Sequence, residues 1–282
     1  MTSGTTRFSR SAPPARLVAG SAALVVALLA GCTNQQPVKL TVNFASRAEW
    51  RYTTSVRIHG TIGIGDSVRT HAAALAGVLV ASPIDGMPSR ARFRMRDASV
   101  TTDFMDIAQT ESARRQIEAA EADLTLDEGE LLVADSMEIP FLQAAEWNVL
   151  RNLSRVVPVL PASPVYRGTT WEREKTIPLQ TRHGAAIGHV FQLFRLDSVF
   201  TTSGQKTVAA LSWTYTYKVE LVNPDSGSLL TRLPGSGTGT GHAEINVTDK
   251  CLVSARAGFE VPTVTVNGIT IGWKETAEMM LQ

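Results

Sequence analysis

Cysteine is scarce in this sequence, which contains only Cys32 and Cys251 among its 282 residues. Two cysteines cannot form the disulfide framework that stabilises many small secreted domains. They also add little to any metal site, because structural zinc sites draw heavily on cysteine thiolates. The fold must therefore rely on a hydrophobic core.

The chain also lacks an excess of charge of one sign and long apolar segments. It has 27 basic and 26 acidic residues, a net charge of +1, and no basic patch that would indicate nucleic-acid binding. Its longest apolar run, Leu17–Ala30, is shorter than the roughly 20 residues of a membrane-spanning helix. We therefore expect neither a nucleic-acid partner nor a transmembrane helix.

The N-terminus has the layout of an export signal. Arg7, Arg10 and Arg16 form a basic leader without acidic residues, and the apolar run follows it. The run ends in Leu29, Ala30, Gly31 and Cys32, a tetrapeptide that resembles the lipobox of bacterial lipoproteins. The resemblance implies cleavage before Cys32, a diacylglycerol on its sulfur and an acyl chain on the new amine. The alternatives are an ordinary secretory signal with a chance cysteine, or a retained membrane helix.

The predicted organisation follows from this signal. Residues 1–31 form the lipoprotein signal peptide, residues 32–37 a short polar tether, and residues 38–282 a β-rich domain. The tether reaches only about 15–20 Å, so the domain is expected close to the membrane. Thr33, directly after the cysteine, resembles an outer-membrane signal, which predicts, for a bacterium with two membranes, a lipid-anchored protein of the outer membrane that faces the periplasm. The covalent lipid is the only attached group that we expect.

Alternating polar and apolar residues predict strands on both sides of a central helical region. Two turn signals are clear: Gly60–Gly65 is rich in glycine, and the Asn267-Gly268 pair favours a tight hairpin. The early strand segments are Val38–Phe44, Trp50–Ile58, Val68–Ala81 and Ala91–Arg96, and further strands run from Thr170 to Met280. In the last early segment, Arg92, Arg94 and Arg96 share one face, which we interpret as solvated.

The central region changes to a helical period. Phe104–Leu124 and Ile139–Val157 each carry an apolar stripe at helical spacing, and Asp127-Glu128-Gly129 between them predicts a hairpin turn. The second stripe has two interpretations, core packing against the sheet or a lid over a hydrophobic groove. Both need the same residues, so the sequence does not separate them.

The predicted fold is therefore mainly β with some α: a strongly curved, antiparallel sheet with two covering helices. The two strand-rich halves, 38–157 and 158–282, are similar in length. Each opens with a strand centred on a tryptophan, Trp50 or Trp171. This similarity favours an ancient duplication.

The segment Leu160–Trp171 contains a Pro-Val-x-x-Gly-x-x-Trp run and resembles a segment that recurs in uncharacterised bacterial lipoproteins. The resemblance covers roughly residues 38–270 in layout and implies no particular activity. In architecture alone, the predicted fold is also similar to the periplasmic carriers of lipoproteins and lipids. Those proteins fold an antiparallel sheet into a half-barrel whose apolar cavity is covered by helices.

Two motifs are similar to a catalytic motif and to a phosphate-binding motif. Both are interpreted as structural elements of the sheet and its turns instead. Gly65-Asp66-Ser67 is similar to the nucleophile block of an esterase family, but no matching C-terminal Asp-x-x-His follows. The glycine-rich stretch Gly235–Gly241 precedes a strand, whereas a phosphate cradle precedes a helix. We expect a hairpin at Ser67 and a flexible hairpin or sheet bulge at the glycines.

The remaining candidates also favour structural roles. The histidine pairs, His59 with His71 and His183 with His189, lack the compact spacing of a metal site. The paired carboxylates, Glu118 with Glu121 and Asp127 with Glu128, occur where solvated surface is expected, so no acid–base pair is assigned. Cys251 is interpreted as a buried, inert thiol, with a reactive thiol as the alternative.

These observations predict a lipid-anchored lipoprotein of the cell envelope that is not an enzyme. We expect it to bind an apolar small molecule or lipid in the concavity of the sheet. The alternatives are a scaffold for another envelope protein, or a periplasmic serine hydrolase that uses Ser67. No metal ion and no cofactor beyond the covalent lipid on Cys32 are expected.

Overall fold

The computed structural model describes residues 36–125, 130–133, 156–181, 184–221, 237–266 and 268–282. The chain divides into the units Met1–Gln36 and Pro37–Gln282, and every element below belongs to the second unit. The predicted signal peptide and Cys32 lie outside the described residues. None of the helices in the described residues is long and apolar enough to cross a membrane.

Eleven strands, one α-helix and one short 3₁₀ helix make up the described part of the chain. The helices are η1 (Phe44–Ser46) and α2 (Ile107–Ala119). The strands are β1 (Trp50–Ile64), β2 (Ser67–Ile84), β3 (Met87–Thr102), β4 (Glu121–Thr125), β5 (Glu130–Val133), β6 (Thr170–Thr181), β7 (Gly184–Thr201), β8 (Thr207–Leu221), β9 (Gly237–Asn246), β10 (Cys251–Val266) and β11 (Ile269–Leu281).

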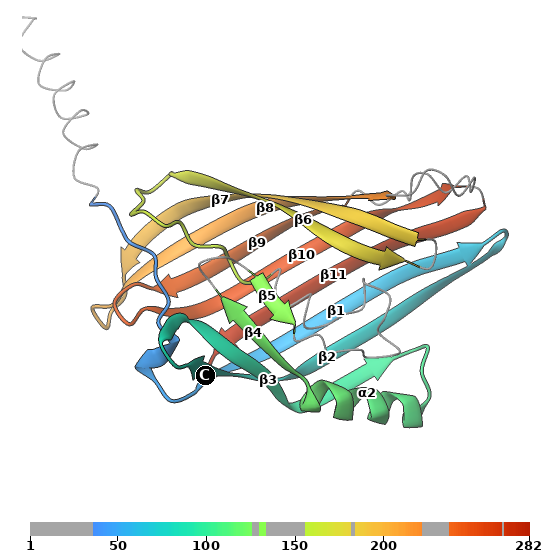
Figure 1. Ribbon diagram of the computed structural model, residues 1–282, viewed down its shortest axis with the longest axis horizontal. Helices are drawn as coiled ribbons and strands as arrows, with labels where there is room; N and C mark the ends of the chain where they lie inside the picture. Colours follow the sequence, from blue (N-terminus) through green and yellow to red (C-terminus); the bar gives the residue numbers. More distant parts are fainter. Residues whose placement is uncertain (1–35, 126–129, 134–155, 182–183, 222–236, 267) are drawn as a thin grey trace, which may run out of the picture. The chain divides into compact units, whose positions relative to one another are not determined.

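All the described strands belong to one antiparallel sheet in the order β5-β4-β3-β2-β1-β11-β10-β9-β8-β7-β6. The first and last strands of the chain pair at its centre, since β1 lies beside β11 with Tyr52 opposite Leu281. Strands β5 and β6 are the two edges, so the sheet is open. The predicted antiparallel sheet is thus confirmed, and its two halves form one sheet (Figure 1).

The two faces of the sheet differ in burial. In β1, Trp50, Tyr52, Val56 and Ile58 are buried, together with Thr54 of the same alternating set, while Arg51, Thr53, Ser55 and Arg57 are exposed or half-buried. We call the face that carries the buried side chains the inner face, and the opposite face the outer face. The alternation follows from the two-residue period of a strand, which sends successive side chains to opposite sides. The predicted alternation in Trp50–Ile58 is therefore confirmed.

Several β-bulges interrupt the regular pairing. The register shifts between Ala76 and Val78 in β2, between Leu196 and Ser198 in β7, and between Val261 and Val264 in β10. A bulge adds an unpaired residue to one strand, which bends that strand and increases the local twist. These bulges help a sheet of this length to twist and curl as Figure 1 shows.

The core is closed at the end of the sheet where β1 begins, which we call the proximal end. Leu40, Val42 and Phe44, which precede β1, are buried there together with Val156 and Leu160. These two segments are joined by a pair of backbone hydrogen bonds between Val38 and Val165. Two tryptophan side chains fix them to the sheet: Trp50 Nε1 donates to Phe44 O at 3.0 Å, and Trp171 Nε1 donates to Val159 O at 2.9 Å.

The first predicted helix is confirmed within shorter bounds. Helix α2 starts at a capping box in which Asp106 Oδ1 accepts from Gln109 N at 2.7 Å and Gln109 Oε1 accepts from Asp106 N at 3.1 Å. It ends before Ala120, so the prediction of a helix through Leu124 was wrong at its C-terminal end. Residues from Glu121 onwards form β4 because they pair with β3.

The prediction of two covering helices holds only in part, because α2 is the one α-helix in the described residues. Of the second predicted helix, Ile139–Val157, residues 139–155 lie outside the described part. Val156 and Val157, its last two residues, lie in a turn and a bend rather than in a helix. The two interpretations of that segment therefore stay open.

Candidate functional site

An aromatic row crosses the inner face over the C-terminal half of the sheet. Trp171 of β6 stacks on Phe194 of β7 with ring centroids 5.7 Å apart, and Phe194 packs on Trp213 of β8 at the same separation. Further along the face, Phe259 of β10 stacks on Tyr215 at 5.2 Å and packs on Trp273 of β11 at 6.0 Å. Register partners bring these rings together, because Trp171, Phe194 and Trp213 lie opposite one another.

Three glycines of β9 make room for this row. Gly237, Gly239 and Gly241 all face inward, opposite Tyr217, Tyr215 and Trp213 of β8. A Cβ atom on Gly241 would lie 2.0 Å from Cε2 of Trp213, and one on Gly239 would lie 2.3 Å from Tyr215. Because these glycines have no side chains, the large rings of Trp213 and Tyr215 can pack directly against β9. The prediction of a hairpin or bulge for this part of Gly235–Gly241 was wrong, because the pairing with β8 and β10 continues through it.

Three buried hydrogen-bonding groups on the inner face have no partner among the described residues: Tyr52 Oη, Trp213 Nε1 and Trp273 Nε1. Tyr52 and Trp213 are only 1% and 2% exposed, and burial raises the pKa of the Tyr52 hydroxyl. A buried donor without a partner is costly, and such groups are normally satisfied by protein, water or ligand. The inner face thus offers hydrogen-bond donors within an apolar surface.

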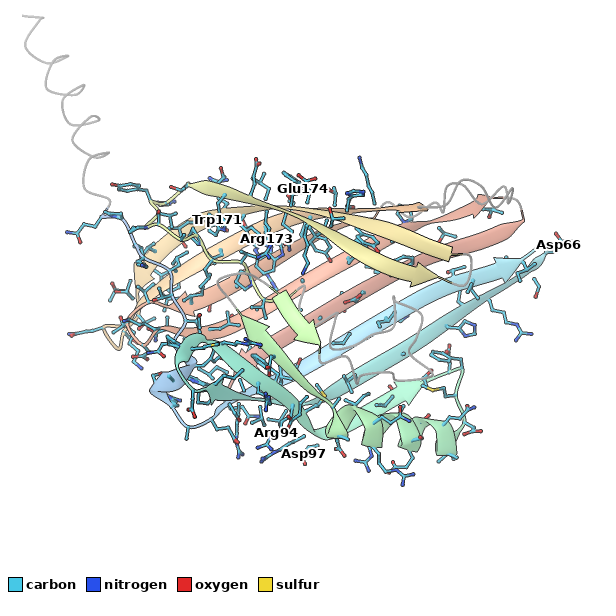
Figure 2. All side chains as sticks on the ribbon, viewed as in Figure 1. Asp66, Arg94, Asp97, Trp171, Arg173 and Glu174 are labelled. Carbon is cyan, nitrogen blue, oxygen red and sulfur yellow. The ribbon has the colours of Figure 1, made fainter. Side chains whose placement is uncertain are left out.

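The inner face stays exposed at the distal end, where β1 turns into β2 at Gly65 and Asp66 (Figure 2). Ile62 and Ile64 continue the inward-facing series of β1, yet they are 57% and 79% exposed. A hydrogen bond from Gly65 N to Gly268 O, 2.7 Å long, joins this turn to the β10–β11 turn. The expected tight hairpin at Asn267-Gly268 fits the described register, in which Val266 lies opposite Ile269. The distal end therefore presents isoleucine side chains to solvent on the face that forms the core elsewhere.

The arginines of β3 lie on the outer face, as predicted. Arg92 Nε donates to Asp123 Oδ1 at 2.9 Å, while Arg94 and Arg96 lie 3.7 and 3.9 Å from Glu49 (Figure 2). Glu49 also accepts a hydrogen bond from Arg51, which lowers the pKa of the Glu49 carboxyl. These are exposed ion pairs, which contribute little to stability.

A pocket of about 320 Å³ opens beside β1, β2, β10 and β11. Its polar lining includes His59, Thr70, Glu260 and Lys274, and Lys274 Nζ lies 3.9 Å from Glu260 Oε2. His71 also lines it, with Nδ1 3.7 Å from Asp103 Oδ1. His71 pairs with Gly60 and so belongs to the inner face, whereas His59 belongs to the outer face, and the register therefore does not bring the two rings together.

No group of three potential metal ligands gathers within the described part of the chain. The second histidine pair is not tested as a pair, since His183 lies outside that part while His189 lies in β7. Of the carboxylates, Glu118 accepts hydrogen bonds from Arg114 at 2.6 Å and from Ala98 N at 2.9 Å. Glu121 lies 3.7 Å from Arg92, and Asp127 and Glu128 lie outside the described residues. The two described carboxylates therefore act as structural ion-pair partners.

Ser67 lies at the start of β2, opposite Ile64, and it is exposed. His71 lies four residues further along the same face of this strand, about 13 Å away at the usual rise of a strand. A serine nucleophile needs a base within hydrogen-bond reach. The structure does not bring this serine and this histidine together.

The thiol of Cys251 is 3% exposed, and burial raises its pKa. A raised pKa lowers the thiolate fraction at pH 8, and the thiolate is the reactive form. In the Cys32→Ser variant, we therefore expect Cys251 to be unreactive towards Ellman's reagent in the native protein and to react fully in guanidinium chloride. Rapid reaction of the native protein would instead favour the reactive-thiol alternative.

No protein-family model and no curated protein matches this chain. Among solved structures, it is similar to lipovitellin, from a study of lipid–protein interactions, with a TM-score of 0.48 and 11% identity over 88% of this chain. The match covers 25% of that chain, so this chain spans about a quarter of its length. A LolA superfamily protein from Nitrosomonas europaea covers 82% of this chain and 86% of its own, with a TM-score of 0.14 and 8% identity. A DUF1329 family protein from Desulfovibrio piger covers 84% and 85%, with a TM-score of 0.14 and 10% identity. All three TM-scores are below 0.5, so no argument about function rests on these likenesses.

Proposed function

We propose that this protein is a lipid-anchored lipoprotein of the cell envelope that binds an apolar ligand or lipid on the inner face of its sheet. The observation that carries the proposal is the exposure of Ile62 and Ile64, which face inward at the distal end. A sheet face that buries its apolar side chains along most of its length and exposes them at one end offers a surface for an apolar ligand.

The unpaired donors strengthen this interpretation. Trp213 Nε1 and Trp273 Nε1 have no acceptor among the described residues and lie in the same apolar surface. Ligand sites combine apolar walls with a small number of polar groups that fix orientation. An oxygen-bearing amphiphile, such as a lipid, matches that combination better than a pure hydrocarbon does.

The path of the chain is compatible with an anchor at Cys32. Val38, directly after the predicted tether, pairs with Val165 at the proximal end. From there β1 runs 15 residues, about 50 Å, to the exposed isoleucines. A lipid on Cys32 would hold the proximal end at the membrane and leave the distal end free to receive a ligand. For a bacterium with two membranes, Thr33 supports an anchor in the outer membrane, facing the periplasm.

We also infer that the protein binds its ligand without converting it. This inference is supported by the separation of Ser67 from His71 and by the structural roles of Glu118 and Glu121. Turnover of an ester substrate that is lost in a Ser67→Ala variant would favour the hydrolase alternative instead.

Binding of a fluorescent apolar probe, diphenylhexatriene, to the Cys32→Ser protein tests the proposed site. Replacing Ile62 and Ile64 with serine is expected to weaken binding at least tenfold, because burial of each isoleucine against a ligand is worth about 1.5–3 kcal/mol. Both positions are already exposed, so the melting temperature should change little.

Val68→Ser is the matched control. Val68 is on the same hairpin and 51% exposed, but it faces outward. It should leave the affinity for the probe unchanged. Absence of probe binding, together with absence of lipid in solvent extracts of protein purified from its membrane, would overturn the proposal. A stably co-purified envelope protein in that case would favour the scaffold alternative.

A further inference from the structure

Two positively charged residues lie on the inner face of the edge strand β6. Along 171–176, Trp171, Arg173 and Lys175 are half-buried, while the residues between them are exposed. The register agrees, since Trp171 lies opposite Phe194, which faces the core. Figure 2 shows Arg173 and Glu174 on opposite sides of β6. A strand that turns an apolar side chain inward at Trp171 thus also turns two cations inward.

Arg173 is not neutralised within the described part of the chain. No carboxylate there forms an ion pair with it, whereas the arginines on the outer face of β3 lie beside Glu49 or Asp123. Its register partner is Gln192, which is half-buried and lies opposite Tyr215 on β8. On this face, the neighbours of Arg173 therefore include the neutral Gln192 across the pair and Trp171 of the aromatic row along the strand.

A half-buried cation beside aromatic rings is costly unless an anion accompanies it. Arginine binds carboxylates and phosphates through paired, charge-assisted hydrogen bonds. Trp213, two strands away, adds an unpaired indole N–H in the row that begins at Trp171.

From this arrangement we infer that the ligand of the inner face is an anionic amphiphile. Arg173 binds its carboxylate or phosphate head, and its hydrocarbon chain lies against the apolar inner face. This inference rests on the proposed function and specifies the class of ligand.

Inward-pointing charges also have a structural use, because they discourage edge strands from pairing with other molecules. That role and ligand binding predict different results. If the charges only prevent edge pairing, removing them changes the association between protein molecules. If they form a head-group site, removing them changes only the affinity for anionic ligands.

The test compares hexadecanoate with hexadecanol, which share a chain and differ in charge, using the Cys32→Ser protein at pH 8. We expect hexadecanoate to bind about tenfold more tightly, and Arg173→Gln to abolish that preference while leaving the affinity for hexadecanol unchanged. Arg57→Gln is the matched control, since it removes the same charge from an exposed position on the outer face of β1. It should keep the preference.

A parallel titration with hexadecyl phosphate distinguishes a phosphate head from a carboxylate head. The ligand that binds more tightly, hexadecyl phosphate or hexadecanoate, carries the head group that the site prefers.

Equal affinity for hexadecanoate and hexadecanol would overturn this inference and leave the proposed function standing. Failure of both to bind would overturn the two together. If Arg173→Gln promotes association of the protein while the monomer keeps its preference for hexadecanoate, Arg173 only prevents β6 from pairing with other molecules, and the inference is wrong. The comparison of the two ligands on the protein with Arg173 intact needs no variant, so it stands even if Arg173→Gln does not fold.

Discussion

An alanine at Gly241 is expected to destabilise the protein by about 3 kcal/mol, although it adds only one methyl group. Its Cβ would lie 2.0 Å from Cε2 and 2.1 Å from Cζ2 of Trp213. The indole cannot move aside easily, because it is 2% exposed and packs against Phe194. For a domain of this size, that loss lowers the melting temperature by roughly 6–12 °C, which thermal unfolding followed by circular dichroism would measure.

Gly258→Ala provides the matched control. Gly258 lies in the adjacent strand β10, opposite Thr240, and a Cβ there would have its nearest neighbours at 3.7 and 4.0 Å. Because alanine loses less conformational entropy than glycine on folding, this change should be neutral or stabilising by about 0.5–1 kcal/mol. Trp213→Leu in the Gly241→Ala background should recover part of the loss by removing the clashing ring atoms. If both alanine variants melt at the same temperature, the glycines do not serve to seat the aromatic row.

This contrast shows what the sequence could and could not predict about β9. The spacing of Gly237, Gly239 and Gly241 is the period of a strand, and Trp213, Tyr215 and Tyr217 repeat with the same period in β8. Both signals are visible in the sequence. The glycines lie beside the aromatic residues because β9 pairs with β8. The register of such a pair depends on both segments, so neither segment alone predicts it.

The boundaries of elements show the same limit. Gly60–Gly65 was predicted as a turn, yet β1 continues to Ile64 and only Gly65, with a φ of +60°, lies in the turn. Glycine marks flexibility in the isolated chain, while the pairing of β1 with both β2 and β11 keeps the strand extended. Similarly, Glu121 and the residues after it continue a helical pattern in the sequence but pair with β3. In both places tertiary pairing outweighs local propensity.

For the candidate site, the sequence predicted the outer-face arginines correctly and missed the inner-face cations. Arg92, Arg94 and Arg96 alternate with Phe93 and other apolar residues, so their direction was clear from the pattern alone. In β6, both alternating sets contain charges, and only the position of Trp171 shows that Arg173 and Lys175 belong to the inner set. The side of the sheet on which Trp171 lies depends on Phe194 and Trp213, which are distant in the sequence.

Replacing Cys32 with serine is expected to abolish lipid attachment and block cleavage of the signal peptide. Without the sulfur no diacylglycerol can be attached, and two or more acyl chains, each worth about 0.8 kcal/mol per buried CH₂, account for stable anchoring. Labelled palmitate should fail to enter the variant, and its apparent size should increase because the uncleaved signal peptide is retained.

The controls separate anchoring from folding. Cys251→Ser should keep both the label and the membrane fractionation, because the buried thiol at that position is not part of the predicted lipobox. The described fold lies within Pro37–Gln282, so Cys32→Ser should leave the melting temperature unchanged. If the serine variant still incorporates palmitate, the lipid is not on Cys32. The apolar inner face and its cations would then have to be explained without an anchor that holds the proximal end at a bilayer.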